Sequence, residues 1–209
     1  MKNNIEKARR IIGCCFIFLQ ISCVKKERQS GSEGITMSVR LEHYSYRFAE
    51  QVLNSRLSIK NELEEIIRDS TSDLSLLSRP VFNDILKNNF INKGWVSQPD
   101  VFDQETDAYA RFDFLKDRVG VEVQFGHPSF VGIDLLKFQI ASYSNLDEID
   151  LGVYIVATNH FIKEMPIKFG KINPNMKWNG SLPYEKVIKY LPHVKSAIQV
   201  PVFVIGIDI

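Results

Sequence analysis

The feature that most restricts the fold of this chain is a pair of short apolar segments near its centre. Residues 109–115 and 119–125 are rich in aromatic and β-branched residues, and the charged triplet Lys116-Asp117-Arg118 joins them. Two such runs separated by a short polar connection predict a β-hairpin. Asp-Arg is not one of the pairs that tight hairpin turns favour, so the type of turn stays open.

The alternation of side chains along a strand places the polar residues of this hairpin. Glu122 and Gln124 are predicted to share one face of their strand, and Phe112 and Phe114 to take the face opposite Asp113. With the turn at the charged triplet, Asp113 lies directly across from Glu122. Directly opposed residues have Cβ atoms about 4.5–5.5 Å apart, which is close enough for two carboxylates to share a cation.

The rest of the chain mixes strand and helix patterns. Strands are predicted at residues 39–46, 149–157 and 200–207, an extended segment at 95–96, helices at 58–69, 78–93 and 133–143, and a polar loop at 98–107. Ser58 is predicted to cap the first helix, whose acidic residues Glu62, Glu64 and Glu65 form a solvated face. These elements predict an α/β or α+β domain with a central mixed sheet flanked by helices.

The first 36 residues differ from the remainder. Basic residues precede an apolar run at 11–23, which is too short to cross a bilayer but has the form of a signal peptide. The alternative is that the functional chain begins at Met37. Residues 37–209 are predicted to form a single domain. All three cysteines lie in the leader, so this domain has no disulfide and no thiolate metal site. The lack of disulfides favours the cytoplasm.

The charge of the chain is also uneven. Of its 26 basic and 25 acidic residues, 7 and 3 lie in the leader, so residues 37–209 carry a net charge of −3. This balance excludes a strongly basic, non-specific nucleic-acid binder. A DNA-binding protein of this composition needs its basic residues gathered on one face and a metal ion at its acidic centre.

The opposed acids Asp113 and Glu122 suggest such a centre. Two carboxylates on adjacent strands repel each other, and the pKa of one of them rises unless a cation lies between them. Mg²⁺ prefers carboxylate, carbonyl and water oxygens, and the backbone carbonyl of Val123 is a third candidate ligand. A bound ion of this kind activates water and neutralises charge on a phosphate. Judged by spacing alone, the exposed side of a two-faced hairpin is the more ordinary interpretation.

A resemblance adds to this interpretation. The stretch Phe112-Asp113-Phe114-Leu115-Lys116-Asp117-Arg118-Val119-Gly120-Val121-Glu122-Val123-Gln124-Phe125-Gly126 resembles the active-site segment of the BglII/BstYI family of type II restriction endonucleases, and the similarity continues through residues 129–131 and 134–135. The resemblance implies a restriction-endonuclease-like PD-(D/E)XK core in which Gln replaces the usual final Lys. It also implies cleavage that leaves a 5′-phosphate and a 3′-hydroxyl at sites centred on GATC.

The same resemblance assigns roles to individual residues. Asp113 takes the place of the metal-binding acid, Glu122 that of the second acid, and Gln124 that of the lysine. Gln carries no charge, so its expected role is to orient the attacking water by hydrogen bonding. A fourth polar residue from an upstream helix often completes these sites; Asp84 and Gln98 are the candidates.

Other residues are candidates for DNA contact. His127 falls where relatives carry different polar residues near the recognition surface, so His127 and Ser129 are expected near an outer base; an ordinary turn before Pro128 is an equal alternative for His127. Lys137 is a candidate for a phosphate contact, although a solvated helix lysine is the commoner case. Trp178, in the Pro-, Asn- and Gly-rich run 165–183, belongs either to a DNA-contacting loop or to an ordinary surface loop.

The sequence therefore predicts a Mg²⁺-dependent endonuclease for double-stranded DNA. Cutting both strands of a palindrome calls for a homodimer, and a cognate DNA methyltransferase is expected in the same system without a stable complex. No membrane partner is expected. The alternatives are a PD-(D/E)XK repair or junction-resolving nuclease and, from another class, an exported lipoprotein or a non-catalytic DNA-binding module.

Overall fold

A computed structural model describes residues 38–100, 111–143 and 148–209, all within one compact unit. The predictions for the leader, for Tyr109 at the start of the hairpin and for most of the 98–107 loop lie outside the described residues. Within the described ranges, no helix combines the length and apolarity needed to span a membrane.

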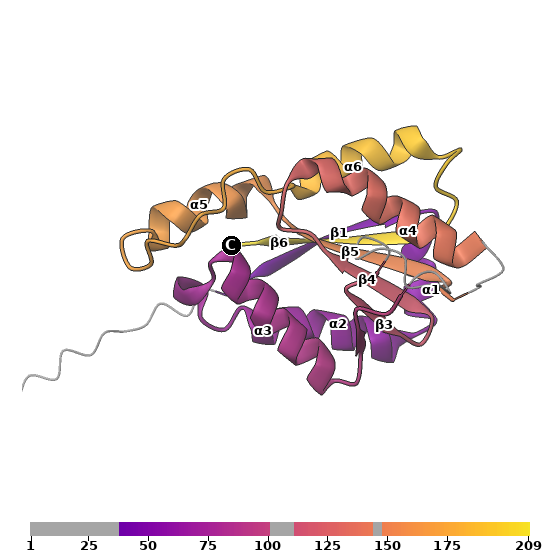
Figure 1. The fold of residues 1–209 in the computed structure, drawn as a ribbon, viewed down its shortest axis with the longest axis horizontal. Helices are drawn as coiled ribbons and strands as arrows, with labels where there is room; N and C mark the ends of the chain where they lie inside the picture. Colours follow the sequence, from indigo (N-terminus) through magenta and orange to yellow (C-terminus); the bar gives the residue numbers. More distant parts are fainter. Residues whose placement is uncertain (1–37, 101–110, 144–147) are drawn as a thin grey trace, which may run out of the picture. The chain divides into compact units, whose positions relative to one another are not determined.

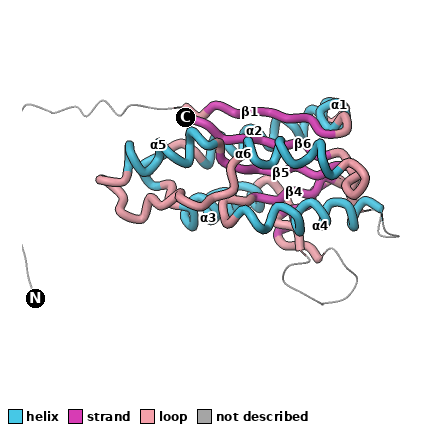
Figure 2. Tube along the Cα trace, turned by 90° about the horizontal axis from the view of Figure 1, so that it is seen from above, coloured by secondary structure: helices cyan, strands magenta, loops and turns pink. Residues whose placement is uncertain are grey.

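A mixed six-stranded sheet forms the centre of the fold, as predicted. Its strands are β1 (Arg40–Tyr46), β2 (Val96–Ser97), β3 (Phe114–Lys116), β4 (Val119–Val123), β5 (Leu151–Ala157) and β6 (Val202–Asp208). The spatial order is β1-β6-β5-β4-β3-β2; β4, β5 and β6 are parallel, and the strands on either side of them are antiparallel. Figure 2 shows β1, β6, β5 and β4 side by side.

Helices cover both faces of this sheet (Figure 1). The helices are α1 (Ala49–Asn54), α2 (Leu57–Ser70), α3 (Arg79–Asn92), α4 (Val131–Tyr143), α5 (Asn159–Phe169) and α6 (Tyr184–Tyr190). One face, called here the α3 face, carries α1, α2 and α3; the other, the α4 face, carries α4 and α6. Each face has its own apolar cluster of buried side chains.

The strand alternation explains why two cores form. In β5, Val153 and Ile155 belong to the cluster on the α3 face, whereas Tyr154 and Val156 belong to the cluster on the α4 face. The parallel register pairs Glu122 of β4 with Tyr154. Residues paired in adjacent strands share a face, so Glu122 points to the α4 side of the sheet.

A glycine brings α4 close to the sheet. A Cβ atom at Gly152 of β5 would lie 2.6–2.8 Å from the ring of Phe138, so the absent side chain leaves room for an α4 aromatic ring directly on the strand. Phe138 is fully buried and stacks with Phe112 at a centroid distance of 5.5 Å. This contact sets how near the polar residues of α4 come to β4 and β5.

Two details of α2 differ from the prediction. The helix begins at Leu57 after Arg56, and Ser58 lies inside it without capping it. Glu62 is not solvated: it accepts hydrogen bonds from Trp95 Nε1 at 2.6 Å and from Lys116 Nζ at 2.8 Å. The acid ties α2 to the outer strands of the sheet, a long-range contact that helical periodicity does not predict.

Candidate active site

The predicted hairpin is present, and its turn lies at the predicted residues. Asp117 and Arg118 have φ values of 47° and 63°, the pattern of positive angles that a type I′ turn requires. The register pairs Phe114 with Val121 and Lys116 with Val119. Two non-glycine residues thus adopt the left-handed conformation to connect the strands.

The chain bends at Asp113, which changes the predicted faces. Phe114 stacks on Phe90 of α3 at 4.1 Å, whereas Phe112 belongs to the cluster on the α4 face. The prediction that both rings share a face is wrong, because β3 begins only at Phe114 and strict alternation does not extend through the bend. Gln98, with φ of 53°, donates its backbone N–H to the Asp113 carbonyl at this bend.

Asp113 and Glu122 nevertheless line one cavity. Asp113 Oδ2 accepts a hydrogen bond of 2.8 Å from the backbone N–H of Val123, so its carboxylate is held beside β4. Glu122, only 4% exposed, enters the cavity from β4 itself. The cavity has a volume of about 250 Å³ and is lined by Gln98, Arg111, Phe112, Asp113, Glu122, Val123, Gln124, Phe130, Ile133, Asp134 and Lys137. The three residues predicted to be catalytic thus meet.

The electrostatics of this cavity are unfavourable for two free carboxylates. Burial, with a further contribution from the neighbouring Asp113, raises the pKa of Glu122 to about 9. Burial also raises the pKa of Asp113, although the hydrogen bond from Val123 opposes the shift. Burial therefore disfavours two ionised carboxylates in this cavity unless positive charge lies close to them.

Lys137 lies inside this site, not on the helix surface. Its exposed fraction is 8%, and its Nζ lies 2.6 Å from Glu122 Oε1 and 3.2 Å from Asp134 Oδ1. Burial lowers the pKa of Lys137, but the two carboxylates outweigh burial and raise it overall. The interpretation as a solvated helix lysine is wrong, because Phe138 packs against the sheet and carries the preceding residue inward.

Sequence reasoning missed the residues that hold this arrangement. Asp134 Oδ2 accepts hydrogen bonds from Gln124 Nε2 at 3.1 Å and from the buried Tyr154 hydroxyl at 2.8 Å. Gly126 donates its backbone N–H to Gln124 Oε1 at 2.7 Å. The Gln124 carboxamide is therefore fixed at both ends. The signal available in the sequence was the i, i+3 spacing of Asp134 and Lys137 on one face of a predicted helix.

The two candidates for a fourth polar residue both lie near Asp113. Gln98 lines the cavity described above, and it also lines a second cavity of about 260 Å³ together with Asp84, Asp113 and Val123. Asp84 belongs to α3, on the opposite face of the sheet from Lys137. Asp113 thus lies between two cavities, and Gln98 is the candidate that contacts the same space as Glu122.

The remaining DNA-contact candidates fall into two groups. His127 and Ser129 are exposed, and His127 Nδ1 accepts from the Ser129 backbone N–H at 3.3 Å, so His127 caps the short turn that precedes α4. Trp178 is fully buried and donates Nε1 to the Leu77 carbonyl at 3.0 Å. Trp178 is therefore a core residue, and neither surface-loop interpretation holds for it.

The donor set fits a hard divalent cation. Among the described residues, no group of three or more His, Cys, Asp or Glu side chains is arranged to hold a metal ion. Asp113 and Glu122 nevertheless offer carboxylate oxygens to one cavity, and burial raises the pKa of both, which a bound cation would oppose. Mg²⁺ commonly binds through one or two carboxylates and completes its shell with water and phosphate oxygens.

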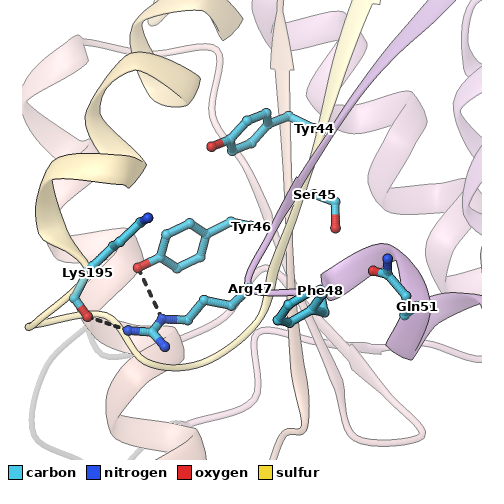
Figure 3. Close-up of a pocket in the computed structure, with 7 residues that line it drawn as sticks. All are labelled: Tyr44, Ser45, Tyr46, Arg47, Phe48, Gln51 and Lys195. Carbon is cyan, nitrogen blue, oxygen red and sulfur yellow. Dashed lines mark hydrogen bonds between the residues drawn. The ribbon is translucent and has the colours of Figure 1, made fainter.

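A larger hollow of about 490 Å³ lies at the far end of β1, lined by Tyr44, Ser45, Tyr46, Arg47, Phe48, Gln51 and Lys195. Figure 3 shows the Arg47 guanidinium between the Tyr46 hydroxyl and the Lys195 carbonyl, to which it donates at 3.3 and 2.5 Å. The second bond connects Lys195, in the segment between α6 and β6, to the residue that follows β1. The hollow contains none of the predicted site residues.

Comparisons with known proteins agree with the fold. The fold is similar to that of restriction endonuclease BglII complexed with a DNA 16-mer, with a TM-score of 0.61 and 19% identity over 80% of this chain and 75% of that chain. Free BglII gives a TM-score of 0.53 and 19% identity over 80% and 78%. No curated protein sequence matches. The family model described as restriction endonuclease BglII/BglIII matches residues 41–207, and the chain therefore belongs to this family of type II restriction endonucleases, which are site-specific deoxyribonucleases.

Proposed function

We propose that residues 37–209 form a single endonuclease domain that hydrolyses double-stranded DNA with Mg²⁺ at a short palindromic site centred on GATC. The products are a 5′-phosphate and a 3′-hydroxyl. The enzyme acts in the cytoplasm, and a cognate DNA methyltransferase, which forms no stable complex with it, protects the host. One observation carries the proposal: Asp113, Glu122 and Gln124 line a single cavity.

The side chains of this cavity suit phosphodiester hydrolysis. Asp113 and Glu122, with the Val123 carbonyl, are the proposed ligands of the ion. When bound, Mg²⁺ supplies Lewis-acid stabilisation of phosphate charge and lowers the pKa of water. Gln124 is held by Asp134 and Gly126, and its carbonyl oxygen keeps a second lone pair with which to orient the attacking water.

The DNA would approach past the exposed turn at His127 and Ser129. Their polar groups precede α4 and suit contact with an outer base of the site. Lys137 is a less suitable phosphate contact, because its ammonium is already engaged with two carboxylates. Sequence discrimination at the outer bases is therefore assigned to the turn.

A homodimer is supported by the outer surface of α4. Leu136 and Tyr143 are large apolar residues that are 44% and 70% exposed, and their spacing of seven residues places them on one side of the helix. An exposed apolar stripe of this kind marks a protein contact more often than open solvent. A second copy on this surface would place two centres about a dyad, as a palindrome requires.

The test is digestion of an unmethylated plasmid with Mg²⁺ or with EDTA, followed by sequencing of the ends. Wild-type protein is expected to give discrete fragments that end at GATC-centred sites, and Asp113→Asn to give none. Glu164→Gln is the matched control, because Glu164 lies on α5 and pairs only weakly with Lys168, at 3.8 Å. Its digestion pattern should equal that of the wild type.

The other outcomes identify the alternatives. Cutting of branched DNA without discrete fragments from the plasmid would indicate a repair or junction-resolving nuclease. DNA binding without cleavage under any metal would indicate a non-catalytic binding module. Recovery in the membrane fraction with Cys23 as the first residue would indicate an exported lipoprotein.

A further inference from the structure

Lys137 is buried and lines the cavity of the candidate site. Its ammonium is surrounded by Glu122 Oε1 at 2.6 Å, Asp134 Oδ1 at 3.2 Å and the Arg111 carbonyl at 3.1 Å. The Arg111 carbonyl accepts a hydrogen bond from the ammonium, and the two carboxylates are its ion-pair partners. A side chain engaged in this way is part of the site and not a free contact for the DNA backbone.

The lysine also joins elements that are far apart in the sequence. Glu122 lies on β4, Asp134 on α4, and Arg111 in the segment that precedes β3. Tyr154 of β5 donates its hydroxyl to Asp134, and this bond holds the partner of the lysine in place. The position of the Glu122 carboxylate therefore depends on an ammonium that arrives from the helix above the sheet.

The positive charge of Lys137 also matters, because more acidic than basic residues line the cavity. Three acids, Asp113, Glu122 and Asp134, line the cavity, and its basic lining residues are Arg111 and Lys137. Arg111 donates Nε to Asp100 at 2.6 Å, whereas the charge of Lys137 lies among the carboxylates themselves. Gln124, which directly follows β4, supplies no charge.

We propose that Lys137 is a positioning residue of the reaction centre, which holds Glu122 toward the cavity and supplies there the positive charge that Gln124 lacks. This rests on the proposed function, because it deepens the role of that same site. The proposal has two consequences of opposite sign. Lys137 repels a divalent cation, so its removal tightens metal binding; Lys137 also orders the site, so its removal slows cleavage even when metal is saturating.

The experiment compares Lys137→Met with Lys189→Met, which removes a positive charge from the exposed surface of α6. Binding of Ca²⁺ without DNA is measured by calorimetry, and single-turnover cleavage is measured at saturating Mg²⁺. Lys137→Met is expected to bind Ca²⁺ about tenfold more tightly, because a charge is lost within a few ångströms of the ion. It is expected to cleave about 100-fold more slowly. Lys189→Met should change neither quantity.

Two further variants keep the result interpretable. Lys137→Gln retains a hydrogen-bond donor for the Arg111 carbonyl and replaces Lys137→Met if the latter does not fold. Asp134→Asn removes a negative charge and leaves Lys137 to Glu122 alone, so Ca²⁺ should bind more weakly to this variant. Opposite shifts in the lysine and aspartate variants support the proposal, and a merely structural lysine would not produce them.

Several results would overturn it. Equal or weaker Ca²⁺ binding by the lysine variants, unchanged cleavage, or failure of both lysine variants to fold would each show that Lys137 has another role. Failure of the proposed function is distinguishable: wild-type protein that binds Ca²⁺ but never cuts DNA removes the nuclease assignment, while the Ca²⁺ affinities still report on Lys137.

Discussion

Replacing Glu122 by Gln should stabilise the metal-free protein while it abolishes cleavage. Glu122 is 4% exposed, and its pKa is raised from 4.5 to about 9, chiefly by burial. At pH 7 the unfolded chain carries this group ionised, whereas burial makes the ionised form costly in the folded, metal-free protein. The difference between pH 7 and 4.5, at about 1.4 kcal/mol per pH unit, corresponds to about 3 kcal/mol of lost stability.

The direction of the pH dependence follows from the raised pKa. Below pH 4.5 the group is protonated in both states and has no effect on the free energy of unfolding. As the pH rises from 4.5 toward 9, the folded state binds more protons than the unfolded state, and the wild type loses stability relative to Glu122→Gln. Lys137 keeps Asp134 as a partner in the variant, at 3.2 Å.

The assay is urea unfolding of both proteins in EDTA at about pH 5.5 and about pH 8. The variant should be the more stable at both, and the gap should widen by about 3 kcal/mol across this interval. Adding Mg²⁺ at about 100 times its Kd should stabilise the wild type by about 3 kcal/mol and the variant by less. A gap that stays constant or narrows toward pH 8 would refute the reasoning, because burial of an ionised Glu122 would then be favourable.

Three further substitutions test how the site is held. Gly126→Ala places a Cβ 2.7 Å from Gln124 Oε1. Because Gln124 relieves this contact by turning its carboxamide away from Gly126 and Asp134, the free energy of unfolding should change by less than about 1 kcal/mol while single-turnover cleavage falls at least about tenfold; equal losses in both would contradict this. Tyr154→Phe removes the buried hydroxyl that donates to Asp134 Oδ2, which leaves Gln124 Nε2 as the remaining hydrogen-bond donor to that oxygen, and should lower the free energy of unfolding by about 1–3 kcal/mol, measured in urea. Gly152→Ala forces a phenyl ring of α4 away from β5 and should cost about 1–3 kcal/mol or more, with a matching fall in the melting temperature; an unchanged melting temperature would show that α4 adjusts freely.

Most of the sheet could be predicted because local patterns determine it. The strands β1, β5 and β6 and the hairpin of β3 and β4 coincide with apolar or alternating runs, and α3 begins after Ser78 and ends before Gly94, whose φ is 81°. Such signals act over a few residues and do not depend on the rest of the fold.

The helices that the sequence did not predict are α1, α5 and α6, and their local sequences do not favour a helix. Helix α1 follows Arg47 and Phe48, two non-glycine residues with φ of 51° and 60° that no propensity anticipates. Helix α5 contains Pro166 in its last turns, and Pro183 introduces α6. In each case contacts with the sheet stabilise a helix that its own sequence favours only weakly.

The candidate site also combines contacts that local sequence spacing predicts with contacts that depend on the packing of distant elements. The sequence relates Asp113, Glu122 and Gln124 to one another because they lie in or next to one hairpin, where strand geometry converts sequence spacing to distance. Their catalytic roles rest on the resemblance to the family segment and stay a prediction. The contacts of Lys137 and Tyr154 could not be predicted, because the docking of α4 on β5 brings Lys137 to Glu122 and the parallel pairing of β4 with β5 brings Tyr154 there. That docking depends on an aromatic ring resting on a glycine, which no short motif encodes.

In the proposed enzyme, two residues share the tasks that a single strand lysine would perform, which are orienting a water and supplying positive charge. Gln124, fixed between Asp134 and the backbone of Gly126, is suited to orient a water, and Lys137 supplies charge from the helix. In the proposed enzyme, helix α4 carries Lys137 toward Glu122, and its exposed side carries the apolar stripe of Leu136 and Tyr143. A second copy bound to that stripe would fix the same rigid helix that positions the lysine. Dimer formation and assembly of the centre would then depend on one element.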